Sequence, residues 1–407
     1  MRIRLDMDSK KKSNMFLRSL WSNFYTKTGN CAWNYFPYKI GKENKIILGH
    51  MSTGIGLYSV VVYYKDKGVI KELEFLNSDD TEICENEQTQ IKEIIEISKK
   101  TYESLNESFF ACTVQSFFSL SNNDSEYYSI QSVDDGRANI SMQVLNYGIK
   151  DGQYIFQKKI RRFLDVLSIL TNVPFYFADR IIKEKEIREI KYYEDDEYID
   201  GYPVADENLL LPRYAKIILD KVVKFEEDDN DDQLLKLLRA CKHFHSGRKY
   251  DALLLDLVIP AESSEKRKAL RTKLMNARDV CDNSYEMAVV SYFSSLEVLS
   301  TIVYEESKER CKTCNQLNFR ISARVKDLLI KYLGEDMGKY LHKYYASRSQ
   351  FLHTGNSLTS PYIGTTIPQL VVDNAVNVEL IFEVPLLNLR EYVSYCIRRV
   401  IKDYFLS

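Results

Sequence analysis

Short runs of apolar residues separated by polar turns fill the chain from about Lys45 to Tyr147. The runs are rich in β-branched and aromatic residues, which favour extended structure. Polar segments such as KDKG and SVDDG lie between them and are typical of turns. We therefore expect strands in KIILGHM, GLYSVVVYY, VIKELEFL, FFACTVQSFFSL and ANISMQVLNYG.

Two segments of this first part repeat their apolar residues every three or four positions, which is the spacing of an amphipathic helix. In EQTQIKEIIEISKKTYESL the residues Ile91, Ile94 and Ile95 share one face, and residues 157–170 carry a similar stripe. Strands interrupted by helices predict an α+β domain over residues 1–225, to which the pattern assigns no role.

From Gln233 onward the pattern is helical throughout. Five amphipathic segments of this length predict an all-α helical bundle over residues 233–407, although Pro385 should break or kink the start of the last segment. The segments are LLKLLRACKHF, SYEMAVVSYFSSLEVLSTIVY, RISARVKDLLIKYL, MGKYLHKYYASRSQFLH and ELIFEVPLLNLREYVSYCIRRVIKDYF.

The two parts meet at residues 226–232, where six of seven side chains are carboxylates. These charges repel one another unless water surrounds them, so we expect a solvated acidic linker and place the domain boundary there. An acidic docking strip or a metal cluster is the alternative, but the segment shows no ordered spacing of metal ligands.

The overall charge and composition limit the classes of molecule that the chain is expected to bind. Lys and Arg number 56 against 58 for Asp and Glu, so a nucleic-acid binder acting through bulk positive charge is not expected, while a local basic site is still allowed. No apolar run reaches the roughly 20 residues of a membrane span, and the start resembles no secretory leader. We expect a soluble, cytoplasmic chain whose eight dispersed cysteines are reduced.

Several common catalytic motifs are absent from the sequence. Gly54-Ile55-Gly56 lacks the third glycine of a dinucleotide fingerprint, and there is no phosphate-binding GxxxxGK[ST] loop. No HExxH or GxSxG segment occurs either, which leaves zincin and α/β-hydrolase chemistry without motif support. Five histidines in the whole chain leave few candidates for proton transfer.

Arg348 and His353 stand out among the remaining candidates. Arg348 lies seven residues after Leu341, on the stripe that should face the bundle, where a guanidinium needs a partner. His353 follows five residues later, just before Thr354-Gly355, where a glycine can end a helix. A fixed cation and a proton carrier along one helix edge suit attack on a phosphodiester.

The segment Arg348-Ser349-Gln350-Phe351-Leu352-His353 resembles the R-x4-H motif of HEPN domains, and YASRSQFLHTG is most similar to the Apea-type variant. SSLEVL, which contains Glu297, resembles an earlier helix of the family, and RISARVKDLL resembles the segment between them. The resemblance covers roughly residues 233–407, and Ser349 weakly meets the family's preference for a polar residue after the arginine.

The resemblance implies a metal-independent endoribonuclease without a cofactor, plausible as a prokaryotic defence or stress effector. Two copies would bring their R-x4-H helices together into one composite cleft, so it also implies a homodimer. His353 would transfer the proton of the 2′-hydroxyl or the leaving 5′-oxygen, and Arg348 would stabilise the phosphorane. Residues 1–225 would then sense a trigger, ligand or partner, or restrain the nuclease.

A second interpretation requires no reaction. Arg348 could pair with Glu297 simply to fix the register of two helices, and His353 could be an ordinary residue at a helix end. The chain would then be a non-catalytic dimerisation or interaction module, with ligand sensing by the N-terminal domain. Under the catalytic interpretation Glu297 and Ser349 are supporting residues.

Three weaker candidates complete the sequence picture. Cys311 and Cys314 form half of a zinc site with no second pair at a suitable distance, so loop cysteines are the favoured interpretation. His243 and His245 point to different faces of a helix and are expected to be solvated. RNA contacts could come from a small basic patch, although a solvated face is favoured; the patch would comprise Lys242, Arg248 and Lys249.

Overall fold

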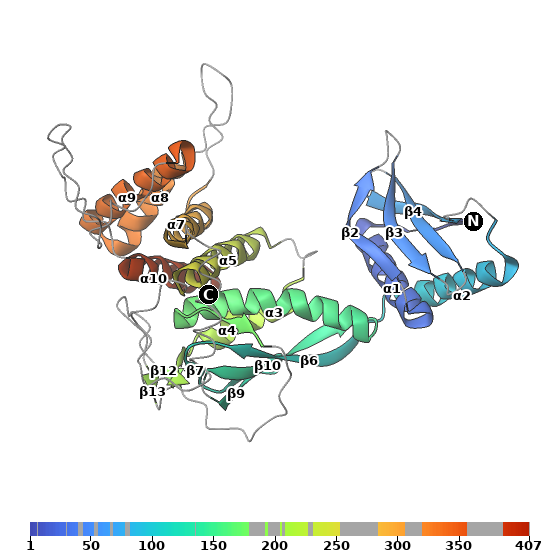
Figure 1. Ribbon diagram of the computed structural model, residues 1–407, viewed down its shortest axis with the longest axis horizontal. Coiled ribbons are helices and arrows are strands. Elements are labelled where there is room, and N and C mark those ends of the chain that lie inside the picture. Colours follow the sequence, from blue (N-terminus) through green and yellow to red (C-terminus); the bar gives the residue numbers. More distant parts are fainter. Residues whose placement is uncertain are drawn as a thin grey trace, which may run out of the picture. The chain divides into compact units, whose positions relative to one another are not determined.

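The chain forms two compact units, which share three continuous elements. The computed structural model describes residues 1–5, 7–29, 31–39, 44–52, 56–65, 68–77, 82–134, 136–178, 192–193, 204–205, 208–226, 231–252, 284–305, 320–355 and 386–406. The first unit comprises Met1–Phe110 and Gln143–Lys158, and the second comprises Ala111–Met142 and Lys159–Ser407. The elements that run from one unit into the other are β6 (Asn106–Gln115), β10 (Arg137–Asn146) and α3 (Ile149–Thr171) (Figure 1).

The first unit is built on an antiparallel sheet in the order β1-β5-β4-β3-β2. Two helices, α1 (Lys10–Thr28) and α2 (Glu85–Thr101), accompany it. The predicted helix after residue 85 and the predicted strands over β3 to β5 are confirmed. The strands are β1 (Arg2–Arg4), β2 (Cys31–Lys39), β3 (Lys45–Ser52), β4 (Leu57–Lys65) and β5 (Val69–Asn77).

One apolar core joins these elements. Phe16, Leu20 and Phe24 of α1 are fully buried in it, as are Leu73 and Phe75 of β5. The three predicted helix-face residues of α2 lie in the same cluster, which explains why α2 has the clearest helical period of this unit.

Helix α1 is not among the predicted elements, and the reason is its composition. Its buried face carries Phe16, Leu20 and Phe24 at helical spacing, but Ser13, Ser19 and Ser22 lie between them and weaken the apolar stripe in the sequence. Its ends are nevertheless well specified. The side chain of Ser9 accepts a hydrogen bond from the backbone N–H of Lys12, and Gly29 ends the helix in the left-handed conformation.

The second unit begins with a sheet in the order β11-β6-β10-β9-β8. Helix α3 packs on it through Phe163, whose ring meets that of Tyr128 of β9 edge-on at 5.0 Å. This unit also contains two smaller sheets. One is three-stranded, in the order β13-β14-β7, and the other pairs β12 with β15. The strands are β7 (Ser119–Leu120), β8 (Asn123–Asp124), β9 (Tyr128–Asp134), β11 (Tyr176–Phe177), β12 (Tyr192–Tyr193), β13 (Val204–Ala205), β14 (Asn208–Leu209) and β15 (Leu211–Pro212).

The described residues of the second unit from Ala215 onward are mainly helical, which agrees with the helical pattern predicted after Gln233. Helix α7 contacts α5, α8, α9 and α10 and is buried on most of its circumference. Gly247 lets α5 approach α7 closely, because a Cβ atom there would lie 2.7 Å from the ring of Tyr292. The helices are α4 (Ala215–Lys224), α5 (Asp232–Ala252), α7 (Ser284–Val303), α8 (Ile321–Leu333), α9 (Glu335–Thr354) and α10 (Leu386–Phe405).

These units differ from the division predicted at residues 226–232, because a sheet and α3 pack with the helices that follow. The described ends of the acidic segment have structural roles. Glu226 pairs with Lys159 at 2.7 Å, and a carboxylate oxygen of Asp231 accepts a hydrogen bond from the backbone N–H of Leu234 at the start of α5. The middle of the segment, residues 227–230, and Pro385 lie outside the described residues.

Helix α7 is long and apolar enough to cross a membrane by length and composition alone. It is the one helix of the described residues with this property, and 61% of the apolar stretch is buried inside the protein. Its apolar character therefore matches its place at the centre of the helix packing.

Candidate functional site

Arg348 of α9 is held by two residues of α7. Its Nη1 donates to Oε1 of Glu297 at 2.9 Å, and its Nη2 donates to Oγ of Ser294 at 3.0 Å and more weakly to Oε2 of Glu297 at 3.5 Å. The hydroxyl of Tyr345 donates to the same Oε1 at 2.6 Å, and the guanidinium lies 5.7 Å from the centre of the Tyr345 ring. We call Arg348, Glu297, Ser294 and Tyr345 the open cluster.

The open cluster is only partly shielded from water. The side chains of Arg348 and Glu297 are 11% and 23% exposed. The Nε–H of Arg348 is buried and finds no acceptor among the described residues. A buried donor without a partner is unfavourable, so this N–H lowers the stability that the ion pair contributes. The pairing of Arg348 with Glu297 that the sequence predicts is confirmed.

His353 lies at the exposed C-terminal end of α9, which Gly355 closes in the left-handed conformation. It lies five positions after Arg348, which corresponds to about 7.5 Å along the helix axis and about 140° around it. Arg348 turns toward α7, whereas His353 turns to solvent. Ser349, the other predicted supporting residue, is half-buried on the same helix.

His243 of α5 lies within electrostatic range of the open cluster. Partial desolvation lowers its pKa, and so do the positive charges of Lys242 and Arg348, while Glu297 acts in the opposite direction. Lys242 and His243 are both exposed, so α5 adds a cation and an imidazole to the surroundings of Arg348.

The predicted basic patch of Lys242, Arg248 and Lys249 is only partly present. Lys242 and Lys249 are exposed and, seven residues apart, share one face of α5. The prediction that Arg248 contacts phosphate is wrong, because its side chain is 3% exposed and its Nη1 donates a hydrogen bond to Oδ2 of Asp251. Its Nε also donates to the carbonyl oxygen of Asn172 at 3.0 Å.

Arg248 belongs instead to a buried group of polar residues. The hydroxyl of Tyr292 donates to Oδ2 of Asp251 at 3.0 Å, and Nη1 of Arg390 approaches the same oxygen at 3.4 Å. We call Arg248, Asp251, Tyr292 and Arg390 the sealed cluster. It joins α5, α7 and α10, and the flanking Asn172 connects it to the end of α3.

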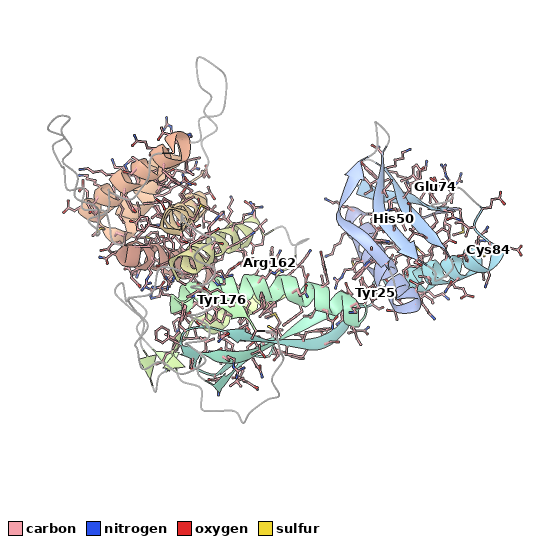
Figure 2. All side chains as sticks on the ribbon, viewed as in Figure 1. Tyr25, His50, Glu74, Cys84, Arg162 and Tyr176 are labelled. Carbon is pink, nitrogen blue, oxygen red and sulfur yellow. The ribbon has the colours of Figure 1, made fainter. Side chains whose placement is uncertain are left out.

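Burial shifts the pKa values of two neighbours of the sealed cluster, Glu391 and Tyr176. Burial raises the pKa of Glu391, although the nearby arginines of α10 and α5 act against that shift. Burial also raises the pKa of Tyr176, the residue of β11 labelled in Figure 2. Both changes favour the uncharged form of the group, as expected in a region that excludes water.

The prediction that His245 is solvated is also wrong. Its side chain is 2% exposed, its Nδ1 lies 2.7 Å from Oδ1 of Asp165, and its Nε2 accepts a hydrogen bond from the backbone N–H of Phe175 at 3.0 Å. The acceptor role of Nε2 means that the proton of the neutral ring resides on Nδ1. Burial lowers the pKa of His245.

A metal site has no support within the described ranges. No group of three or more His, Cys, Asp or Glu side chains there is arranged to hold a metal ion. Cys311 and Cys314 lie outside the described residues, so their interpretation stays a prediction.

Two members of the open cluster, Ser294 and Tyr345, were not predicted as site residues from the sequence. Ser294 and Tyr345 each lie three residues before a predicted site residue, one turn away on the same helix face. The signal was therefore present in the helical spacing, but hydroxyl groups are too common on helices for spacing alone to single them out.

Comparisons with models of known families, with curated proteins and with solved structures find no match to this chain.

Proposed function

We propose that this chain is a metal-independent endoribonuclease whose active cleft combines the α9 helices of two copies. One observation carries the proposal: α7 orients the partly exposed guanidinium of Arg348 on the helix that ends with the exposed His353. The resemblance of this segment to the R-x4-H motif of HEPN domains supports the same assignment.

In this mechanism the ribose 2′-oxygen attacks the adjacent phosphorus. The bond from the 2′-oxygen to phosphorus forms, the bond from phosphorus to the 5′-oxygen breaks, and the products are a 2′,3′-cyclic phosphate and a 5′-hydroxyl. His353 accepts the 2′-hydroxyl proton or donates one to the leaving 5′-oxygen. Arg348 stabilises the extra negative charge on the phosphorane. DNA lacks the nucleophile and is not a substrate.

The geometry of α9 favours two copies. Arg348 and His353 of one chain face directions about 140° apart around the helix axis, so one chain alone does not aim both at one phosphate. A twofold contact between α9 helices would place the histidine of one copy beside the arginine of the other. Glu297, Ser294 and Tyr345 would act as positioning residues, because they fix the guanidinium before RNA binds.

The flanking cations fit an RNA path over the surface of α5. Lys242 and Lys249 are exposed on one face and could contact phosphates without reading sequence. The first unit and the sheet of the second would restrain the nuclease or sense a trigger, as in a prokaryotic defence or stress effector acting in the cytoplasm. An unregulated ribonuclease would damage its own cell, which is the reason for a restraint.

A non-catalytic interaction module is the second candidate, and the ion pair between Arg348 and Glu297 favours it. A pair that satisfies both charges can fix the register of α7 and α9 without any reaction. The two candidates differ in what a variant of His353 should do, because only the catalytic one needs an imidazole at this exposed position.

The test uses the full chain, labelled RNA and excess EDTA. The parent should cut RNA to cyclic-phosphate ends and leave DNA of the same sequence intact, while Arg348→Ala and His353→Ala should lose at least about a hundredfold in rate. His342→Gln changes the other histidine of α9 and serves as the matched control at the parental rate. A folded His353→Ala protein that cuts RNA as fast as the parent would contradict the proposal.

Mixing the two inactive variants tests the composite cleft. Each lacks a different group, so a mixed dimer keeps one arginine and one histidine, and it should recover part of the activity if the two copies share a site. Sedimentation should show a dimer for the parent and for both variants.

A further inference from the structure

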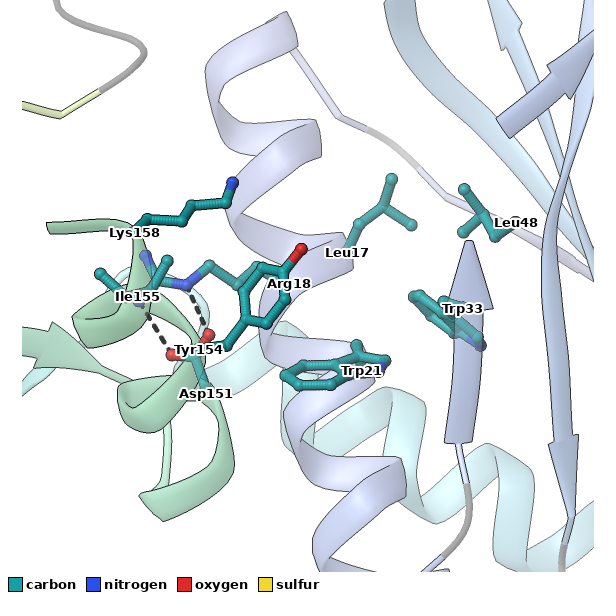
Figure 3. Close-up of a pocket in the computed structure, with 9 residues that line it drawn as sticks. All are labelled: Leu17, Arg18, Trp21, Trp33, Leu48, Asp151, Tyr154, Ile155 and Lys158. Atoms are coloured by element: carbon teal, nitrogen blue, oxygen red, sulfur yellow. Dashed lines mark hydrogen bonds and ion pairs between the residues drawn. The ribbon is translucent and has the colours of Figure 1, made fainter. Parts of the chain in front are cut away.

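The first unit contains a cavity of about 300 Å³ bordered by α1, β2, β3 and the first turns of α3 (Figure 3). All of its lining residues belong to this unit, whereas Arg348 and His353 belong to the other. The volume of the cavity is at the lower end of the range for small-molecule sites, which suits one compact ligand.

The wall of the cavity is mainly apolar. Figure 3 shows Trp33 and Leu48 on one side of α1 and the residues of α3 on the other. A wall of this kind gains most from a ligand that buries apolar surface against it. The aliphatic and aromatic lining residues are Leu17, Trp21, Trp33, Leu48, Tyr154 and Ile155.

The arginine and the carboxylate of the wall satisfy one another. Arg18 donates from Nε and Nη2 to the two oxygens of Asp151, at 2.7 and 2.8 Å, and from Nη2 to the carbonyl oxygen of Leu145 at 2.6 Å. The guanidinium also lies 5.3 Å from the centre of the Tyr147 ring, and Asp151 accepts from the backbone N–H of Tyr147 at 2.8 Å. These contacts join α1 to α3 and give the pair a structural role.

The charges of the wall disfavour an ionic ligand. Lys158 is the third charged residue, and its ammonium lies 5.3 Å from the centre of the Tyr154 ring. An ion that entered the cavity would lose hydration beside a mainly apolar wall, where Arg18 and Asp151 already neutralise one another. An uncharged ligand avoids this loss.

The aromatic part of the wall favours a ligand with an aromatic ring. Trp21 and Tyr154 lie with ring centres 6.3 Å apart and planes inclined at 57°. The indole N–H of Trp21 donates to the carbonyl oxygen of Cys31 at 3.2 Å, which fixes the orientation of this ring. A ligand ring parallel to the indole of Trp21 is therefore inclined at 57° to the ring of Tyr154. Offset-stacked and edge-to-face contacts are the favourable arrangements of aromatic rings, so one ligand ring suits both neighbours in different ways.

We propose that this cavity binds a compact, uncharged aromatic molecule. Its ring stacks on Trp21 alone and meets Tyr154 at an incline, while the ion pair of Arg18 with Asp151 stays intact. The site gives the first unit a ligand of its own, and its binding does not depend on whether the second unit cleaves RNA.

The test exploits the fact that Trp21 and Trp33, the chain's two tryptophans, both line the cavity. Tryptophan fluorescence of the full chain therefore reports on this site. Four probes of similar size separate charge from aromatic character: benzyl alcohol, benzoate, benzylammonium and cyclohexylmethanol. Benzyl alcohol should give a saturable change in fluorescence, and calorimetry should give the same affinity.

The other three probes should bind more weakly, each for its own reason. Benzoate and benzylammonium should bind at least about tenfold more weakly than benzyl alcohol, because each buries a charge in the cavity. Cyclohexylmethanol should bind about threefold to tenfold more weakly, because it lacks the contacts between aromatic rings.

Two isoleucines of α3 provide a matched pair of variants. Ile155→Trp fills part of the cavity and should weaken benzyl alcohol at least about tenfold in calorimetry. Ile149→Trp adds the same side chain at a position that is 74% exposed and outside the cavity wall, so it should leave the affinity unchanged. Lys158→Gln should also leave the affinity for benzyl alcohol unchanged, since the ligand carries no charge. Melting curves check that the variants fold.

The ligand series decides the proposal even if Ile155→Trp does not fold. The absence of a saturable signal with benzyl alcohol would overturn it, and so would benzoate or benzylammonium that binds as tightly as benzyl alcohol, which would indicate a site for ions. Equal binding of cyclohexylmethanol would overturn the aromatic assignment. An equal loss of affinity in the two isoleucine variants would place the binding outside this cavity.

Discussion

The open and sealed clusters are built from the same parts but differ in their access to water. Each centres on an arginine and a carboxylate, and each receives a tyrosine hydroxyl and a contact from α7. In the central ion pair of the sealed cluster the Arg248 and Asp251 side chains are 3% and 6% exposed, whereas Arg390 at the edge of that cluster is 12% exposed. In the open cluster the corresponding values for Arg348 and Glu297 are 11% and 23%.

This difference separates a structural role from a binding role. A sealed ion pair cannot exchange a partner for water, so it fixes which helices meet and in what register. An open pair can accept a further ligand, because solvent and added groups reach its edge.

The largest expected difference comes from neutralising each carboxylate. Asp251→Asn should lower the free energy of unfolding by about 3–5 kcal/mol, because it leaves the buried Arg248 without its counter-charge. Glu297→Gln should lower it by only about 1 kcal/mol, because water can solvate Arg348 in part. Urea denaturation of the two variants measures both values. Equal losses would mean that the clusters do not differ in the way that their exposure indicates.

A smaller difference should follow from removing one hydroxyl in each cluster. Tyr292→Phe should cost about 2 kcal/mol, because no water can replace the hydroxyl on Asp251. Tyr345→Phe should cost about 0.5–1 kcal/mol, because the partly exposed Glu297 can bind water instead. The same denaturation experiment applies, and a larger loss for Tyr345→Phe would reverse the comparison.

The smallest expected effect is the pH dependence that the buried imidazole of His245 gives to the free energy of unfolding. Burial lowers the pKa of His245 below its ordinary value of 6.5, so the unfolded chain binds the proton more readily than the folded one. The stability from this histidine is thus present above about pH 6.5 and is lost as the pH falls through the lower folded pKa.

His245→Gln is the variant for this measurement, because its amide oxygen can still accept from the N–H of Phe175. The free energy of unfolding of the parent should decrease more steeply than that of His245→Gln as the pH falls below 6.5, and the two curves should run parallel above pH 7. Parallel curves over the whole range would contradict the assignment of a neutral buried ring.

Residues whose role depends on neighbours in sequence were predictable. The helix and strand periods of α2, β3, β4 and β5 are local, and so is the stripe of α7, which explains why these elements are confirmed. One longer-range contact was also predictable: Arg348 and Glu297 are 51 residues apart, but an inward guanidinium needs a carboxylate and the predicted helix over SSLEVL offered one.

The buried roles of Arg248 and His245 were not predictable from the sequence pattern. The sequence pattern places both residues at solvated positions of α5. In the structure Arg248 donates to the carbonyl oxygen of Asn172, which follows α3 and lies 76 residues earlier. His245 contacts the carboxylate of Asp165 in α3, 80 residues earlier. Periodicity reports which face of a helix is apolar, and it cannot report that a polar face meets a complementary polar surface.

The division of the units across β6, β10 and α3 has a consequence for biosynthesis. The first unit is discontinuous in the chain, yet its last residue is Lys158, so every segment it needs has left the ribosome before α4 to α10 are translated. Domains generally fold as they emerge, the N-terminal one first. A nascent chain would thus hold a finished N-terminal unit before the helix bearing Arg348 and His353 exists, and a premature stop after Lys158 would release the former without the latter.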